Sequence, residues 1–223
     1  MTLLEHMLIP NLSLRHVQWI PFRFMRVSDK VPRAMATGKQ IVKTMWIDVN
    51  EGDAENPDIR TRLVGKEFRT TPDDALYAST PPLEALRVII SRAATWDAGG
   101  QERELMINDV SRAYFYAEAT RCMYIELPRE DPHYDPNMLG RLRLCLYGTR
   151  DAALNWQQTL PYHLVNNGIM RGTGPPSVFY HGTRDIGRWS TVMATGTPAD
   201  LDWIYSMLAE KLEVKTQRLG SRT

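Results

Sequence analysis

The order of strand-like and helix-like segments after residue 105 places the strongest constraint on how this chain can fold. A strand ending near Val110 is followed by a helix, a pair of strands, a second helix and a final strand. The segments are the strand "LMINDV", a short turn or helix through Tyr116, the strands "CMYIELP" and "RLRLCLYG", a helix from Thr149 with one apolar face (Ala153, Trp156, Leu160, Leu164), and the strand "SVFYH". A return strand, "IGRWSTVM", is predicted next, and then a helix that Thr197 caps and Pro198 opens, with the apolar stripe Leu201, Ile204, Tyr205, Leu208 and Leu212. This order predicts an α+β fold whose antiparallel sheet is a ferredoxin-like split βαβ unit with helices on one face.

Composition sets limits on the class of protein. The chain has 223 residues and a formal net charge of +1, which excludes a strongly basic tail but allows a local basic groove. Its two cysteines, Cys122 and Cys145, are far apart and lack CxxC spacing, so no disulfide partner is expected. No signal peptide and no membrane-spanning run is evident, so we expect an intracellular protein, cytoplasmic or nuclear.

The first hundred residues divide into an irregular part and a regular part. Residues 1 to 37 give no clear periodicity. The segments "QIVKTMWIDV" and "IRTRLVGKEF" alternate apolar and polar residues around the turn "NEGD", which predicts a hairpin. A helix is then predicted from Thr80 as cap and Pro81 as first residue, with one apolar face: Leu83, Leu86, Ile90 and Ala93 or Ala94.

The segment "MINDVSRAYFYAEA" places a carboxylate, Asp109, at the end of an apolar strand, shortly before three aromatic residues. Two interpretations are open. Asp109 can cap the turn that follows the strand, or it can be a metal ligand at an open edge of the sheet. Magnesium prefers hard carboxylate and phosphate oxygens, so the second interpretation requires further acidic residues nearby.

Five collinear segments resemble the reverse transcriptase domain of copia-type LTR retrotransposons. They are "TRLVGKEF" (61–68), "NDVSRAYFYA" (108–117), "MYIELPRED" (123–131), "LCLYGTRDAALNW" (144–156) and "PPSVFYH" (175–181). The resemblance covers residues 40 to 215. It implies polymerase fingers at 38–104 and a palm at 105–223 that stops before a full thumb, with residues 1–37 outside the family.

The same resemblance implies roles for individual residues. Asp109 takes the place of the first metal-binding and catalytic aspartate of an RNA-directed DNA polymerase, and Tyr114 that of the aromatic beneath the incoming sugar. Such a polymerase uses two magnesium ions to activate the primer hydroxyl and stabilise pyrophosphate. Its partners would be an RNA or DNA primer–template and a deoxynucleoside triphosphate.

Basic and loop residues complete the implied nucleotide site. Arg60, Arg62 and Lys66 correspond to cations of the fingers strand that lie over the triphosphate; a solvated strand face is the alternative. Gly148 and Arg150 correspond to the segment that supports the templating base and nucleotide. In that segment Arg150 and Asp151 stand where family members have Lys and Gln, which argues against a nucleotide contact by Asp151.

The second acidic motif of the family, an adjacent Asp–Asp pair, is missing. The chain reads "DIGRWSTVMATGTPADLDW" at that place, and Asp185, Asp200 and Asp202 are not positioned to replace it. One carboxylate is too few to hold two magnesium ions. We therefore expect a reverse-transcriptase-like domain that is catalytically inactive as written.

Two other hypotheses stay open: a repurposed nucleic-acid-binding module, and a non-functional retroelement remnant. A compensated frameshift or a misplaced exon boundary around Trp189 to Val192 would explain the missing pair.

Overall fold

A computed structural model describes residues 25–68, 82–131, 133–173, 177–189 and 193–220. The chain divides into two compact units. The first unit comprises Met1–Leu76 and Ala117–Asn155, and the second comprises Tyr77–Tyr116 and Trp156–Thr223. This division differs from the sequence-predicted boundary at 104/105, because residues 77–104 group with the later strands and residues 117–155 with the earlier ones.

The first unit contains a four-stranded sheet in the order β1-β7-β6-β2. Its strands are β1 (Ser28–Pro32), β7 (Met138–Leu142), β6 (Tyr124–Glu126) and β2 (Ile41–Val42). A single helical turn, α2 (Met25–Val27), precedes β1, and a 3₁₀ turn, η3 (Arg33–Ala36), follows it. The sequence analysis left β1 unassigned because "SDKVP" has no apolar alternation, and β1 is positioned by antiparallel pairing with β7 instead.

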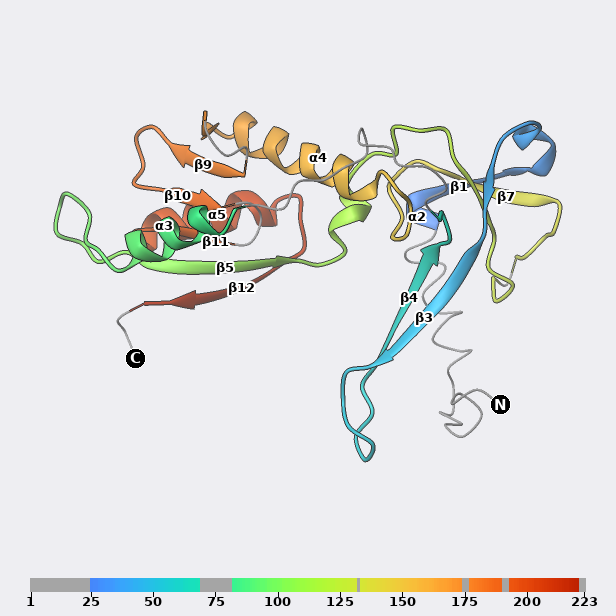
Figure 1. The fold of residues 1–223 in the computed structure, drawn as a ribbon, viewed down its shortest axis with the longest axis horizontal. Coiled ribbons are helices and arrows are strands. Elements are labelled where there is room, and N and C mark those ends of the chain that lie inside the picture. Colours follow the sequence, from blue (N-terminus) through green and yellow to red (C-terminus); the bar gives the residue numbers. More distant parts are fainter. Residues whose placement is uncertain (1–24, 69–81, 132, 174–176, 190–192, 221–223) are drawn as a thin grey trace. The chain divides into compact units, whose positions relative to one another are not determined.

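The hairpin predicted between residues 40 and 69 is present in the first unit. It consists of β3 (Thr44–Asn50) and β4 (Ile59–Gly65), paired so that Ile47 lies opposite Arg62 (Figure 1). The predicted first strand is interrupted at Lys43, because β2 pairs with β6 and β3 pairs with β4. The predicted strand "RLRLCLYG" (141–148) is wrong beyond its first two residues, because β7 begins at Met138 and ends at Leu142.

The second unit contains a six-stranded antiparallel sheet in the order β12-β5-β11-β10-β9-β8, and Figure 1 shows β12 alongside β5. Its strands are β5 (Glu104–Val110), β8 (Ile169–Arg171), β9 (Val178–His181), β10 (Gly187–Trp189), β11 (Met193–Gly196) and β12 (Val214–Leu219). Helix α4 (Ala152–Asn166) begins in the first unit and continues in the second, where α5 (Pro198–Ala209) connects β11 to β12.

Strands β12, β5, β11 and β10 take the order 4-1-3-2 of a split βαβ layout, with β8 and β9 between α4 and β10 extending the sheet. The strands that form this layout differ from those predicted, because "CMYIELP" and the start of "RLRLCLYG" supply β6 and β7 of the first unit's sheet. The sequence analysis predicted one return strand from Ile186 to Met193. That prediction is wrong: β10 and β11 are separate strands, and β11 occupies the central position beside β5.

Side chains alternate between the two faces of the second unit's sheet, and this alternation shows which helices cover each face. Met106, Ala194 and Phe179 lie in one cross-strand row and form a buried core with apolar residues of α4 and α5. Gly187 belongs to the opposite face, where an added Cβ would meet Ile89 of α3 (Leu83–Ala93) at 3.3 Å. The helices α4 and α5 therefore cover one face, and α3 lies on the other.

Two predicted helix faces need correction. In α3, Leu83 and Ile90 are exposed, and Ala85 and Ile89 are buried instead. The apolar residues of α3 are distributed around most of its circumference, so its sequence does not define a single buried face. The packing of Ile89 near Gly187 sets the orientation of the helix instead. In α5, Leu201, Ile204 and Leu208 are buried as predicted, as is Leu212 beyond the end of the helix, but Tyr205 is exposed and Met207 packs in the core.

The ends of the helices follow the predicted chemistry in part. Thr197 caps α5, where its hydroxyl accepts a hydrogen bond from the backbone N–H of Asp200. Pro161 lies inside α4, which continues to Asn166 and is followed by Gly168 at φ +81°. The predicted cap Thr80 and first residue Pro81 lie outside the described residues, as do Asp73 and Asp74.

Candidate functional site

Asp109 is exposed and is the penultimate residue of β5, an interior strand of the second unit's sheet. Met106 and Val110 belong to the core beneath α4 and α5, so the alternation of side chains directs Asp109 to the opposite face. Lys215 of β12 lies directly across from Asp109 in the antiparallel register. Asp109 is thus a solvent-exposed carboxylate next to a cation.

The connection between β10 and β11 lies at the same end of the sheet as Asp109. Trp189 pairs with Met193, and Met193 pairs with Ile107, two residues before Asp109. Three residues, 190–192, join the two strands; they lie outside the described residues, and their sequence Ser-Thr-Val contains no acid. The sequence therefore supplies no second carboxylate at the connection nearest to Asp109.

The other candidate aspartates lie away from Asp109. Asp185 forms ion pairs with Arg92 and Arg103 at the opposite end of β5, about 20 Å along the strand from Asp109 at 3.3 Å per residue. Asp200 accepts a hydrogen bond from Arg184, and Asp202 from Arg218. All three acids are engaged in ion pairs, and Asp200 lies in the first turn of α5.

A tight turn connects Asp109 to the predicted sugar-contacting tyrosine. Arg112 adopts φ +57°, a left-handed conformation that is uncommon for residues other than glycine, and it pairs with Glu213. Tyr114 follows in the 3₁₀ turn η5 (Ala113–Tyr116) and is half-buried. The hydroxyl of Tyr116 accepts a hydrogen bond from the backbone N–H of Glu213, at 3.0 Å, so this turn is fixed to the start of β12.

Two of the predicted cations, Arg60 and Arg62, lie on one face of the β3–β4 hairpin. Arg60 is opposite Val49, and Arg62 is opposite Ile47, so each arginine has an exposed apolar side chain as its neighbour across the strand pair. Arg60 also pairs with Glu51 at 2.9 Å, and both side chains are about half exposed. Lys66 lies one residue beyond β4 and is exposed.

The segments "TRLVGKEF" and "LYGTRD" meet through their backbones in the first unit. The N–H of Gly65 donates to the carbonyl of Tyr147 at 2.7 Å, and the N–H of Glu67 donates to that of Gly148 at 3.3 Å. Gly148 has φ +82°, and a Cβ at this position would lie 2.1 Å from the carbonyl oxygen of Gly65. Only glycine fits this close approach of two chain segments.

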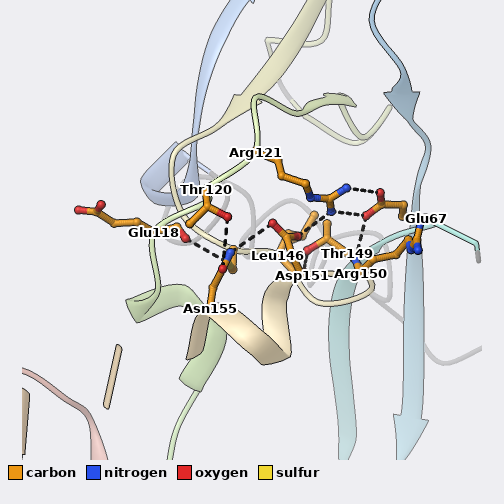
Figure 2. A network of polar contacts seen from close by, with 10 residues as sticks. Glu67, Glu118, Thr120, Arg121, Leu146, Thr149, Arg150, Asp151 and Asn155 are labelled. Carbon is orange, nitrogen blue, oxygen red and sulfur yellow. Dashed lines mark hydrogen bonds and ion pairs between the residues drawn. The ribbon is translucent and has the colours of Figure 1, made fainter. Parts of the chain in front are cut away.

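Side chains reinforce this junction through a network centred on Arg121 (Figure 2). Its guanidinium donates to both carboxylate oxygens of Glu67, at 2.8 and 2.9 Å, and to Asp151 at 2.7 Å. The second oxygen of Glu67 also accepts the backbone N–H of Arg150 at 2.8 Å. The carboxylates of Glu67 and Asp151 are 4% and 3% exposed, so one guanidinium is the shared counter-ion of two buried acids.

The network changes the pKa values of its members. Burial alone would raise the pKa of Glu67 and of Asp151, but hydrogen bonds and charge from Arg121 outweigh it, and both pKa values lie below their usual range. Hydrogen bonds to the same two acids raise the pKa of Arg121. All three groups are therefore charged at neutral pH, which makes Asp151 part of a structural ion-pair network.

Asn155 extends the network toward Cys145 and Thr120. Its side-chain amide donates to Asp151 at 3.2 Å and to the sulfur of Cys145 at 3.3 Å (Figure 2). Burial raises the pKa of the Cys145 thiol, which makes this cysteine a poor nucleophile at neutral pH. Sequence reasoning missed the pairing of Glu67 with Arg121 because the two residues are distant along the chain, and alternation within "IRTRLVGKEF" does not indicate a partner for Glu67.

The seven predicted site residues belong to both units. Asp109 and Tyr114 lie in the second unit, and the others lie in the first: Arg60, Arg62, Lys66, Gly148 and Arg150. Among the described residues, no group of three or more His, Cys, Asp or Glu side chains could hold a metal ion. Asp109 would thus be a single protein ligand beside Lys215, a donor set that does not fit a two-magnesium site.

Comparison with known proteins adds no family: no family model matches the chain. Both cysteines are free thiols. Of the helices in the described ranges, none is long and apolar enough to cross a membrane.

Proposed function

We propose that the chain is a reverse-transcriptase-like domain of the copia type that binds primer–template nucleic acid and does not extend it. The observation that carries the proposal is the exposed carboxylate of Asp109 at the end of a central strand, on the sheet face opposite α4 and α5. Strand order alone is weak support, because many functions share a split βαβ sheet. The five collinear motifs add specificity, and two of them are in backbone contact at Gly65 and Gly148.

In this proposal the second unit is the polymerase palm and the β3–β4 hairpin belongs to the fingers. Arg60 and Arg62 would contact phosphate oxygens, which suit the planar donor geometry of guanidinium groups. Tyr114 would pack beneath a sugar. The two-metal chemistry of the family requires further carboxylates beside Asp109, so no catalytic step is assigned to this chain.

A second candidate, a non-functional remnant, is favoured by one observation in β10. Arg188 is fully buried in the cross-strand row that contains Met106, Ala194 and Phe179. Burial lowers the pKa of Arg188 to about 10. An arginine in an apolar row, just before a connection that lacks the family's acidic pair, is consistent with a strand that has lost its functional sequence.

Two assays separate the proposal from its alternatives. We expect no primer extension with magnesium and all four deoxynucleoside triphosphates, because one carboxylate cannot position two ions. We expect fluorescence anisotropy to show binding to a labelled primer–template duplex, with log affinity falling linearly as log salt concentration rises. Robust extension would contradict inactivity, and the absence of any duplex binding would favour the remnant.

Matched variants assign the binding to the hairpin. The double substitution Arg60→Gln and Arg62→Gln should weaken binding and reduce the salt slope by about two ions. The control is Lys39→Gln with Arg141→Gln, which removes two exposed charges elsewhere in the same unit. Equal losses in the two double variants would show that binding is non-specific and would refute a role for the hairpin face.

A further inference from the structure

The first unit contains a cavity of about 320 Å³ beside the β3–β4 hairpin. Its walls come from the hairpin, from η3 and from the segment between β6 and β7. The volume lies at the lower end of the range of small-molecule sites, which is about 300 to 1,000 Å³. A ligand of one nucleotide or similar size fits such a space.

Aromatic side chains line this cavity. Trp46 is half-buried, and its indole N–H donates to the carboxylate of Glu130 at 2.9 Å, which fixes the orientation of the ring. Tyr134 contributes a second ring to the lining and is 42% exposed. Aromatic rings of this kind stack on planar bases in nucleic-acid-binding proteins, at about 1–3 kcal/mol per base.

Two arginines supply cationic donors to the same cavity. The Nε of Arg33 donates to the carbonyl of Pro136 at 2.9 Å, which leaves the terminal nitrogens of its guanidinium for a ligand. Arg129 is exposed, and no ion pair joins it to any other described residue. Guanidinium groups match the oxygen geometry of a phosphate.

The carboxylates of Glu126 and Glu130 also line the cavity and balance the two arginines. They would repel a simple anion. They would, however, accept hydrogen bonds from an exocyclic amino group, as carboxylates do from the N4 amino group of cytosine. The lining therefore suits a ligand that combines a planar ring, an amino donor and an anionic group.

We propose that this cavity binds a nucleoside monophosphate group whose base carries an exocyclic amine. The ring would stack on Trp46 or Tyr134, the amine would donate to Glu126 or Glu130, and the phosphate would accept from Arg33 and Arg129. The ligand can be a free mononucleotide or an unpaired nucleotide of a single strand. The site uses none of the residues assigned to duplex binding, and so it extends the proposed function without depending on it.

Isothermal titration calorimetry on the full chain tests this site. CMP should bind, UMP should bind at least about tenfold more weakly because it lacks the amine, and inorganic phosphate should not bind. A tetranucleotide of cytidines, compared with CMP, distinguishes the two sources: tighter binding by the tetranucleotide identifies a single strand, and equal or weaker binding identifies the free nucleotide.

Variants locate the binding. Arg33→Gln with Arg129→Gln should weaken CMP binding at least about tenfold. Tyr134→Ala, at a position that is 42% exposed, should also weaken CMP binding by removing a stacking ring. Lys39→Gln with Arg141→Gln is the matched control, since both are exposed cations outside the cavity, and it should leave CMP affinity unchanged. Equal affinity for CMP and UMP, no effect of the cavity variants, or no binding of either nucleotide at millimolar concentration would each overturn the proposal.

Discussion

Two arginines, one in each unit, show how differently the same side chain can be buried. Arg121 of the first unit is bound by the carboxylates of Glu67 and Asp151, and its pKa is raised. Arg188 of the second unit lies in an apolar row of the sheet, and burial lowers its pKa to about 10. The first unit thus holds a partly exposed cation between two buried carboxylates, whereas the second unit encloses its cation completely within the sheet core.

The largest expected effect is the loss of the cation from the first unit. Arg121→Met leaves two buried carboxylates without their counter-charge, which typically costs 3–5 kcal/mol in a fully buried pair. Because the Arg121 side chain is 35% exposed, solvent screening reduces the expected loss to about 2 kcal/mol. Urea-induced unfolding followed by circular dichroism measures this change in the free energy of unfolding.

Two further variants control the Arg121 experiment. Arg62→Met removes an exposed arginine of the same unit and should change stability by less than about 0.5 kcal/mol. Adding Glu67→Gln and Asp151→Asn to Arg121→Met should restore most of the loss, because no buried charge then remains. A triple variant less stable than Arg121→Met would contradict this account of the network.

The corresponding substitution in the second unit should have a smaller effect. Arg188→Met replaces a buried cation by an apolar side chain among Met106, Ala194 and Phe179. We expect the free energy of unfolding to change by less than about 1 kcal/mol, because methionine keeps much of the apolar contact of the arginine stem. A loss comparable to that of Arg121→Met would show that Arg188 makes a specific stabilising contribution, and the comparison would fail.

Lowering the pH should reduce the stability that the ion pairs of the first unit contribute, and this loss should be gradual. The folded pKa values of Glu67 and Asp151 lie below the usual 4.5 and 3.8, so their ion pairs stabilise the protein above these values. That contribution is lost as pH falls below the usual values and through the lowered ones. The midpoint temperature of thermal unfolding should therefore fall more steeply between neutral pH and about pH 3 in the wild type than in Glu67→Gln/Asp151→Asn.

Much of the fold was predictable because it rests on local patterns. Alternation predicted the β3–β4 hairpin, and helical spacing predicted α4 and the buried positions Leu201, Ile204 and Leu208 of α5. The strand β11 was not predictable from "MATG", since small residues carry no strand signal and its place is set by pairing with β5. The orientation of α3 likewise depends on a tertiary contact, between Ile89 and Gly187.

The candidate site was predictable only where a residue lies in a recognisable segment. The position of Asp109 at a strand end followed from the apolar run before it. The partners of Asp151 did not, because Glu67 and Arg121 come from distant segments that only the folded chain brings together. The roles proposed for Arg60, Arg62, Lys66, Tyr114 and Arg150 stay predictions.

Gly148 has a consequence for reading mutational tolerance across the chain. Its missing side chain is demanded by the backbone oxygen of Gly65, so no change of side chain at position 65 can make room for an alanine. Gly38 and Gly100 also have positive φ, but open space surrounds both, and they should accept asparagine. A deep mutational scan should thus find position 148 nearly invariant on grounds of folding alone, and retention of this glycine in a diverging lineage would not be evidence that nucleotide binding is under selection.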